Sequence, residues 1–283
     1  MKATVLVPTH DHGPTLEYSV GSALAQTIED LEVLIVGDGV PDATREVVAR
    51  LRDGDPRVRF FDFPKGPRHG EIHRHQVLTS QARGEIVCYL ADDDLWFPDH
   101  LEEMATLLTV ADFASTLPVF VRVGGGLKAF GLDLSLPATR RTMQRGLSFF
   151  GLSSAGHTLS MYRRLPHGWR TTPSGIATDL YMWQQFLAIP ACRAASSPRP
   201  TMLHFPSPWR RGHPIDQRVT ELETYHARLA DLHWRRQLEL DILAAVVREQ
   251  AKLVTSRWWR LGCQLRRPLN WIRERVGSDR GAG

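Results

Sequence analysis

The first hundred residues alternate short apolar runs with stretches of helical periodicity. The apolar runs are typical of buried strands and cover residues 3–7, 31–36, 58–63 and 86–90. Pro14 suits the first turn of an intervening helix, Asp42 can cap a second one, and Pro98 can open a third. Strands separated by helices imply crossover connections. The pattern therefore predicts an α/β fold with a mainly parallel sheet flanked by helices.

The pattern becomes less regular in the second half of the chain. Residues 119–123 predict a strand, residues 124–126 a turn, and residues 179–187 a helix rich in aromatic side chains. Residues 218–256 carry apolar side chains at helical spacing and predict a helical C-terminal extension. We therefore expect an α/β domain over residues 1–208, made of the halves 1–110 and 111–208. A helical extension is expected over residues 209–283.

The composition is that of an ordinary globular protein. Of the 283 residues, 42% are hydrophobic and 23% are charged, which excludes a disordered chain, a collagen-like repeat and a disulfide-stapled scaffold. No apolar run approaches the roughly 20 residues that a membrane-spanning helix needs. The three cysteines, Cys88, Cys192 and Cys263, form no CxxC pair, which favours a reducing, cytoplasmic environment.

The formal net charge of +4 is concentrated in the C-terminal tail. Residues 209–283 hold 15 Lys and Arg against 9 Asp and Glu, whereas residues 1–208 hold 20 against 22. Since the body is slightly acidic, we expect no nucleic-acid partner. Residues 252–275 combine seven basic residues and one Glu with three tryptophans, Trp258, Trp259 and Trp271. This segment suits an interfacial helix on an anionic membrane surface, but it could equally form a homo-oligomer or pack against the body.

Polar residues follow the predicted strands directly. In parallel α/β sheets, ligands bind at the carboxyl ends of the strands, where this chain has residues 10–13, Asp38 and the run Asp92-Asp93-Asp94. Three adjacent carboxylates repel one another unless a cation or protons neutralise them. Mg²⁺ and Mn²⁺ bind through one or two carboxylates together with substrate phosphates. The run therefore favours a metal site for a nucleotide diphosphate, with a solvated acidic turn as the alternative.

Three segments carry a family resemblance. Residues 82–101, with the sequence ARGEIVCYLADDDLWFPDHL, resemble the central motif of family 2 glycosyltransferases. Residues 5–9 and 33–39 are similar to two further motifs of the family, in the right order. The resemblance is close over residues 1–110 and looser over residues 111–208. It implies a GT-A fold, Rossmann-like in its sheet. The implied activity is inverting, metal-dependent transfer of a sugar to a hydroxyl group in glycan, glycolipid or natural-product synthesis.

The resemblance also implies roles for individual residues. The donor would be a nucleotide diphosphate sugar, with a UDP-sugar expected, and the cofactor would be Mg²⁺ or Mn²⁺. Asp92 and Asp93 would correspond to the DxD-like pair, with Asp93 on the metal and Asp94 and His204 as further metal contacts. A buried structural histidine is the alternative for His204. The remaining donor-binding residues implied are Pro8, Thr9, His10, Asp38 and Arg74.

An inverting transferase needs a carboxylate that takes the proton of the acceptor hydroxyl as this group attacks the anomeric carbon. In the family, this base lies in a Glu-Asp pair at the start of a helix, and the matching segment here is Thr178-Asp179-Leu180. Asp179 is therefore the predicted catalytic base. A helix N-cap is the alternative role for Asp179.

Departures from the family pattern leave other functions open. Gly37 and Val40 replace an acid and a serine that the family usually carries, and Thr178 replaces a glutamate. A non-catalytic nucleotide-sugar-binding or scaffold protein is therefore one alternative. A sugar-phosphate nucleotidyltransferase is another, although it would need a glycine-rich basic loop where residues 10–14 read HDHGP. If the tail binds a membrane, the protein would be peripheral at its inner face, with a lipid-linked acceptor.

Overall fold

The computed structural model describes residues 1–255 of the chain. It contains two compact units, of which the first spans Met1–Arg235 and the second begins at Arg236. The first unit thus continues past residue 208, where the sequence suggested the end of the α/β domain. Segment 252–275, with its three tryptophans, lies outside the described residues except for positions 252–255.

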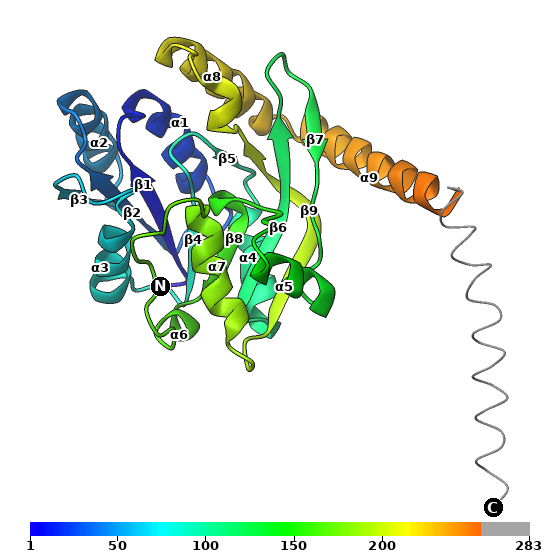
Figure 1. The fold of residues 1–283 in the computed structure, drawn as a ribbon. Coiled ribbons are helices and arrows are strands. Elements are labelled where there is room, and N and C mark those ends of the chain that lie inside the picture. The colour runs from blue at the N-terminus through cyan, green and yellow to red at the C-terminus, as the bar shows by residue number, and fades with distance from the viewer. Residues whose placement is uncertain (256–283) are drawn as a thin grey trace, which may run out of the picture. The chain divides into compact units, whose positions relative to one another are not determined.

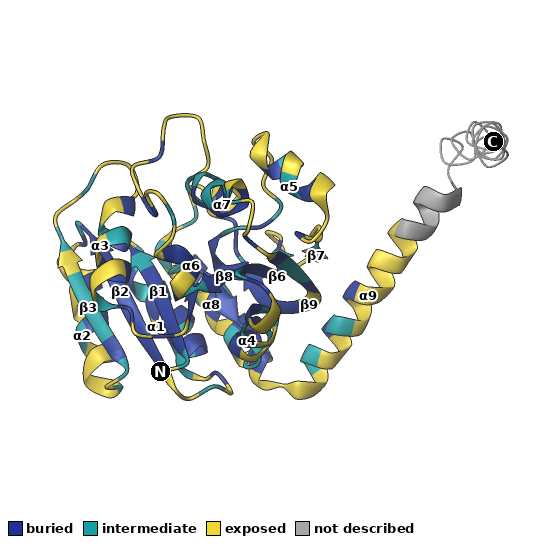
Figure 2. Ribbon diagram, turned by 90° about the horizontal axis from the view of Figure 1, so that it is seen from below, coloured by how far each residue is buried: buried dark blue, intermediate teal, exposed yellow. Residues whose placement is uncertain are grey.

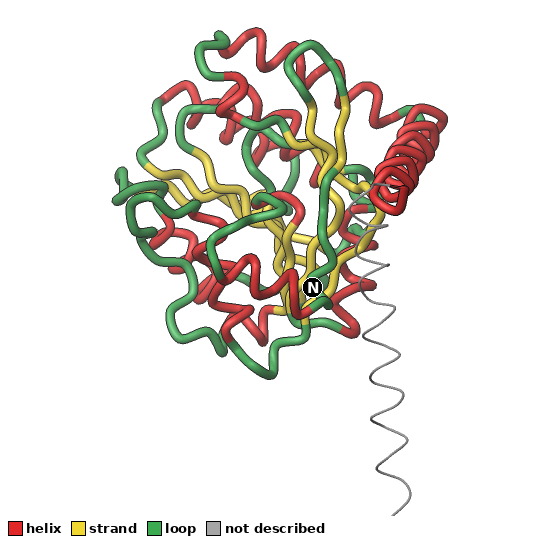
Figure 3. Tube along the Cα trace, turned by 45° about the vertical axis from the view of Figure 1, so that its right-hand side comes forward, coloured by secondary structure: helices red, strands yellow, loops and turns green. Residues whose placement is uncertain are grey.

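One sheet of nine strands runs through the first unit, and helices surround it (Figures 1 and 3). The strands pair in the order β3-β2-β1-β4-β8-β6-β9-β5, and β7 pairs with β6. Their bounds are β1 Ala3–Thr9, β2 Leu31–Asp38, β3 Val58–Phe63, β4 Ile86–Tyr89, β5 Leu95–Trp96, β6 Phe113–Val121, β7 Leu127–Ala129, β8 Ala155–Thr158 and β9 Ala194–His204.

Most of the helices lie in the connections between strands, and the last two follow β9. Their bounds are α1 Gly13–Leu24, α2 Asp42–Gly54, α3 Glu71–Gln81, α4 His100–Val110, α5 Pro137–Gln144, α6 Leu159–Tyr162, α7 Thr178–Ala188, α8 Ile215–Ala230 and α9 Leu232–Thr255. Short 3₁₀ turns lie at Leu152–Ser154 and Ser207–Arg210. No helix within residues 1–255 combines the length and the hydropathy needed to cross a bilayer.

The first strands are continuously apolar because both faces of the sheet are covered. Successive side chains of a strand point to opposite faces, and in β1 Leu6 belongs to one core cluster while Val5 and Val7 belong to the other. Helices α1, α2 and α4 contribute to the cluster of Val5, and α3, α6 and α7 to that of Leu6. Figure 2 shows the strands of this sheet as largely buried.

The predicted strands at 3–7, 31–36, 58–63 and 86–90 are confirmed as β1 to β4. Strand β1 pairs in parallel with β2 and β4, and β2 with β3, as the crossover pattern predicted. The second half is mixed, because β8 runs antiparallel to β4 and β6 whereas β6 and β9 are parallel. The sequence pattern missed β9 and most of β6, and the predicted helical run 218–256 is broken between α8 and α9.

Helix α8 belongs to the first unit. Its buried Tyr225 contacts the ring of Phe205, with the ring centroids 5.6 Å apart. Arg210, fully buried after β9, donates from Nε and Nη2 to the Glu221 carboxylate of α8, both at 2.6 Å. A bidentate, charge-assisted contact of this kind is among the stronger hydrogen bonds in proteins. It holds α8 beside the end of β9.

Candidate active site

A pocket of about 510 Å³ opens at the carboxyl ends of the first strands. Its volume lies within the range of small-molecule sites. Strands β1, β2 and β4 are parallel, so the residues that follow each of them reach the same edge of the sheet. Every residue that the sequence suggested for the site lines this pocket, namely Pro8, Thr9, His10, Asp38, Arg74, Asp92, Asp93, Asp94, Asp179 and His204.

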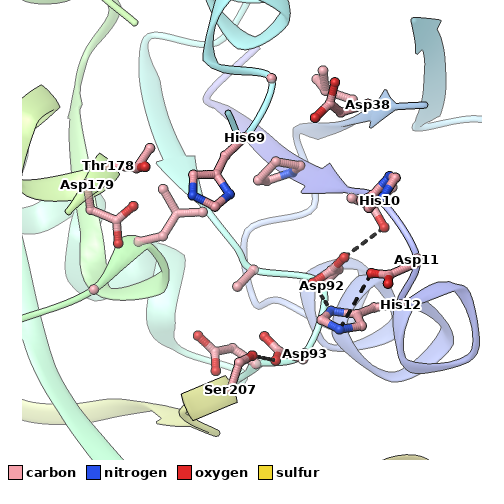
Figure 4. A pocket seen from close by; sticks show the side chains of 18 of the residues that line it. His10, Asp11, His12, Asp38, His69, Asp92, Asp93, Thr178, Asp179 and Ser207 are labelled. Carbon is pink, nitrogen blue, oxygen red and sulfur yellow. Dashed lines mark hydrogen bonds and ion pairs between the residues drawn. The ribbon is translucent and has the colours of Figure 1, made fainter. Parts of the chain in front are cut away.

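Asp92 follows β4 and contacts the loop after β1 (Figure 4). Its Oδ2 accepts a hydrogen bond from Thr9 Oγ1 at 2.8 Å, and its Oδ1 lies 3.1 Å from His12 Nδ1. Thr15 Oγ1 donates to the backbone carbonyl of Asp92 at 2.7 Å. The hydrogen bond to Asp92 raises the pKa of His12, whereas burial of the ring and the Arg218 charge oppose its protonation. Asp92 is thus tied to the β1 side of the pocket.

Asp93 is buried and is held by residues that follow β9. Its Oδ2 accepts hydrogen bonds from Ser207 Oγ, at 2.7 Å, and from Arg218 Nη2. Arg218 Nη1 also lies 2.8 Å from His12 Nε2, and since a guanidinium can only donate, Nε2 accepts. Burial, and then the neighbouring carboxylates, raise the pKa of Asp93 to about 6. Both hydrogen bonds go to Oδ2, so Oδ1 can still accept a ligand.

Asp94 makes contacts of a different kind from those of Asp92 and Asp93. Its carboxylate accepts hydrogen bonds from Ser153 Oγ at 2.5 Å and from the Phe205 backbone at 2.9 Å. The Nδ1 of His204 lies 3.0 Å from both of its oxygens. Although burial acts in the opposite direction, the nearby carboxylates, led by Asp94, raise the pKa of His204. Asp94 and His204, both predicted as metal contacts, thus contact each other.

Within the described part of the chain, His12, Asp92 and Asp93 form a group that could hold a metal ion. One ligand atom of each residue lies within 4.8 Å of the others. Carboxylate oxygens are the ligands that Mg²⁺ and Mn²⁺ prefer, and an imidazole nitrogen is a further ligand for transition metals. This donor set fits a divalent cation. Asp94 and His204, which the sequence suggested as further metal contacts, are not members of this group.

Asp38 ends β2 and is contacted by the loop after β3. Lys65 Nζ donates to its Oδ2 and the Gly66 backbone to its Oδ1, both at 2.6 Å. The neighbouring Gly37, which departs from the family pattern, is closely packed. A Cβ at this position would lie 3.0 Å from the ring of Phe60 and 3.1 Å from Val40. A larger side chain at residue 37 would therefore require these two side chains to shift by a few tenths of an ångström.

Asp179 lies in the first turn of α7, across the pocket from Asp92 and Asp93 in Figure 4. Burial raises the pKa of its carboxyl group, although the charges of Arg74 and His204 and a backbone hydrogen bond act in the opposite direction. The N-cap position of α7 is occupied by Ala177. Asp179 is therefore not the N-cap of this helix.

Arg74 places a buried cation near Asp179. Its Nη2 donates to the His69 carbonyl at 3.0 Å, and its guanidinium lies 4.8 Å from the centre of a Trp169 ring. Within residues 1–255, its buried Nε has no hydrogen-bond partner. Burial lowers the pKa of Arg74, while the charges of Asp179 and Glu71 act in the opposite direction. A buried donor without an acceptor is costly, so an anionic ligand would satisfy this position.

Glu71 organises the segment that leads to Asp179. This fully buried carboxylate accepts hydrogen bonds from the backbone of Thr172 and of His69, both at 3.2 Å. Thr178 Oγ1, adjacent to Asp179, lies 3.5 Å from it. Glu71 therefore connects α3 to the segment that leads to α7 and to the first residue of that helix.

Sequence reasoning did not assign five residues of this site. His12 lies in the polar run 10–13 after β1, and Ser207 lies three positions after His204, so proximity to those positions was a usable signal. Lys65 and Glu71 could be placed only through their contacts. Arg218 lies on α8 and is 125 positions from Asp93 in the sequence. No local pattern marks an arginine in an amphipathic helix as part of a distant site.

Comparison with known proteins assigns the family. Residues 4–167 match the family described as Glycosyl transferase family 2. The chain belongs to this family. A curated relative from Campylobacter jejuni, GalNAc(5)-diNAcBac-PP-undecaprenol beta-1,3-glucosyltransferase, is 33% identical over 96 residues, which make up 33% of this chain and 30% of the relative. The chain spans about a third or less of the length of the curated relatives that it matches.

Solved structures confirm the GT-A fold of this family member. The TarS 1-349 structure from S. aureus in complex with UDP-GlcNAc superposes with a TM-score of 0.57 at 17% identity, covering 86% of this chain and 72% of that chain. The mannosyltransferase PcManGT from Pyrobaculum calidifontis in complex with GDP-Man and Mn²⁺ gives 0.53 at 18% identity, covering 92% and 82%. At these identities, the likeness concerns the fold alone.

Proposed function

We propose that this chain is an inverting, metal-dependent glycosyltransferase that moves a sugar from a nucleoside diphosphate to a hydroxyl group. The observation that carries the proposal is the pairing of two acidic centres in one pocket. Asp92 and Asp93 follow β4 and form a cation group with His12, while Asp179 lies across the pocket. One centre suits the donor diphosphate and the other suits the acceptor.

In the proposed reaction, Asp179 accepts the proton of the acceptor hydroxyl. The hydroxyl oxygen forms a bond to the anomeric carbon, while the bond from this carbon to the diphosphate oxygen breaks and releases a nucleoside diphosphate. A base works best when its pKa approaches the working pH. Burial moves the pKa of Asp179 in that direction, which supports this role.

The donor occupies the wall formed by the strand ends. Pro8, Thr9, His10 and Asp38 contact the nucleoside, and Arg74 and His204 contact the diphosphate. The raised pKa of His204 favours its cationic form, which suits an anionic ligand. Asp92 and Asp93 hold Mg²⁺ or Mn²⁺, which when bound offsets negative charge on the leaving diphosphate. Asp94 acts through His204.

A UDP-sugar is the proposed donor, since TarS binds UDP-GlcNAc on a similar fold. A GDP-sugar is the competing choice, because PcManGT binds GDP-Man. Thermal unfolding with UDP, UDP-GlcNAc, GDP or GDP-Man, each with Mn²⁺ and with EDTA, tests the proposal because a bound ligand raises the midpoint. Mn²⁺-dependent stabilisation by one nucleotide is expected. If none of them shifts the midpoint, the donor assignment fails.

Release of free sugar from the stabilising donor, without any acceptor, then separates an enzyme from a bare binder. A glycosyltransferase is expected to hydrolyse its donor slowly, and the Asp179→Asn variant is expected to do so more slowly still. A scaffold protein would show no release above the rate in buffer. That outcome would favour the non-catalytic alternative.

The acceptor is proposed to be lipid-linked and reached from the inner membrane face. The support is the basic, tryptophan-bearing sequence of residues 252–275, together with the PP-undecaprenol acceptor in the name of the Campylobacter relative. The chain of residues 1–283 is expected to sediment with anionic vesicles at low salt and to be released as salt rises. A chain ending at Leu253 is expected to bind donor but not vesicles. A change in oligomeric mass on truncation would instead assign the tail to self-association.

A further inference from the structure

Arg218 inserts a permanent positive charge into the cation group of the pocket. Its Nη2 donates to Asp93 Oδ2, and its Nη1 donates to His12 Nε2. The same guanidinium thus contacts two of the three residues that could hold a metal. Arg218 lies on α8, outside the residues that match the family.

The position of Arg218 is fixed by the packing of its helix. Arg210 clamps Glu221 on the next turn of α8, and Leu222 and Tyr225 of this helix are buried. The Arg218 side chain is about 10% exposed, and its buried Nε has no hydrogen-bond partner within residues 1–255. The charge is therefore held in place and largely desolvated, a setting in which it acts strongly on neighbouring charges.

Loss of Arg218 could change the affinity of the pocket for a divalent cation in either direction. If Arg218 only orients Asp93 and His12, its loss would weaken metal binding, because outer contacts that fix ligands support affinity. If its charge dominates, its loss would strengthen metal binding, because a nearby like charge disfavours a cation. The charge term is expected to dominate, because the guanidinium is in direct contact with both ligand residues.

We propose that Arg218 is a built-in counter-cation that suppresses metal binding by the free protein and couples it to binding of the donor diphosphate. In the free protein, Arg218 neutralises Asp93 and leaves less negative charge for the metal. The diphosphate brings its own negative charge into the pocket and restores the balance. This inference rests on the proposed function, since it requires a nucleoside diphosphate and a divalent cation to share the pocket.

The test is a thermodynamic cycle measured by titration calorimetry, with Mn²⁺ and UDP as probes, or with GDP where the thermal test selects it. The Kd of Mn²⁺ is measured with and without nucleotide, and its free concentration is checked by electron paramagnetic resonance. The variants are Arg218→Gln, which removes the charge, and Arg218→Lys, which keeps it. The matched control is Arg228→Gln, because Arg228 is exposed on the same helix and contacts the Tyr225 ring. The circular dichroism and unfolding midpoint of each variant report its folding.

We expect Arg218→Gln without nucleotide to bind Mn²⁺ at least about tenfold more tightly than the unaltered protein, a shift of the size that one nearby charge produces. The enhancement of Mn²⁺ binding by UDP should shrink by the same factor. Because coupling is reciprocal, the enhancement of UDP binding by Mn²⁺ should shrink equally. Arg218→Lys, which keeps the charge, should retain most of the suppression of Mn²⁺ binding, and Arg228→Gln should resemble the unaltered protein.

Weaker or unchanged Mn²⁺ binding in a folded Arg218→Gln variant would overturn the inference and leave Arg218 as an orienting residue, while the proposed function would stand. If Arg218→Gln does not fold, Arg218→Lys decides. If Arg218→Lys binds Mn²⁺ about tenfold more tightly than the unaltered protein, although it keeps the charge, the inference is overturned. If neither nucleotide nor Mn²⁺ binds the unaltered protein, both the inference and the proposed function fail.

Discussion

The carboxylates on the two walls of the pocket differ in their hydrogen-bonding and ionic partners. On the strand-end wall, each of the three adjacent aspartates has a charged or hydroxyl partner. Thr9 contacts Asp92, Arg218 contacts Asp93, and the His204 ring lies against Asp94. On the facing wall, Asp179 receives a backbone hydrogen bond, and its cationic neighbours act through their charge.

This difference separates binding from proton transfer. A carboxylate that accepts hydrogen bonds from charged or hydroxyl partners is held in place and, when ionised, can hold a cation or orient a phosphate group. A carboxylate that is desolvated without a direct ionic partner is easier to protonate, which a general base requires. The strand-end wall is therefore suited to donor binding and the α7 wall to chemistry. Four measurements test this division.

The largest effect is expected for Asp179→Asn, which keeps the shape of the side chain and removes the basic oxygen. Transfer to acceptor should fall by about 10²–10⁴-fold, the usual contribution of a positioned acid or base, with nucleotide affinity unchanged. The control is Asp216→Asn, which removes a charge from the first turn of α8 at an exposed position. Near-normal turnover in Asp179→Asn would show that Asp179, on the α7 wall, is not the base that accepts the proton.

A smaller effect, on binding, is expected for Asp93→Ala. Loss of a charged contact of about 1.5–3 kcal/mol should weaken Mn²⁺-dependent nucleotide binding by roughly 10–100-fold. Calorimetry with Mn²⁺ and with EDTA separates the metal-dependent part, and the unfolding midpoint reports any cost of leaving Arg218 unpaired. Unchanged affinity and metal dependence in a folded variant would show that Asp93 is not part of the cation group.

The pH dependence should distinguish the two walls. The pKa of Asp93 is raised to about 6, and a protonated carboxyl group cannot hold a cation. Protonation of Asp93 should therefore lower Mn²⁺-dependent nucleotide affinity about tenfold for each pH unit well below 6. Turnover at saturating donor should show a separate acid limb from Asp179, shifted upward from that of an ordinary carboxyl group. If this limb persists in Asp179→Asn, it belongs to another residue.

The smallest effect is expected for Glu71→Gln. The amide group presents N–H donors where Glu71 now accepts two backbone hydrogen bonds, so the segment before Asp179 should shift slightly. Small misplacements of a reacting group are costly, and we expect turnover to fall about fivefold to tenfold with little change in nucleotide affinity. Glu46→Gln, at an exposed position of α2, is the matched control. A loss of nucleotide affinity equal to the loss of turnover would contradict a role confined to the α7 wall.

The sequence alone was informative where the structure depends on residues that are close together in the chain. Both faces of the first four strands are covered, so their apolar runs are continuous and easily located. The aspartates that follow β4 are adjacent in the chain and could be placed at a strand end from the pattern itself. The family resemblance added Asp179, and the structure places it in the same pocket. The roles of these residues remain predictions that the variants above test.

Tertiary structure alone decided which side chains surround these aspartates. Strand β9 carries polar and proline residues among its apolar ones, so its pattern did not reveal a strand or the loop that brings Ser207 to Asp93. Arg218 reaches Asp93 from α8, a helix that the Arg210–Glu221 ion pair links to the end of β9, and Glu71 reaches the start of α7 from α3. Such contacts depend on long-range packing between distant segments. Local periodicity, which reports burial along one helix or strand, carries no information about them.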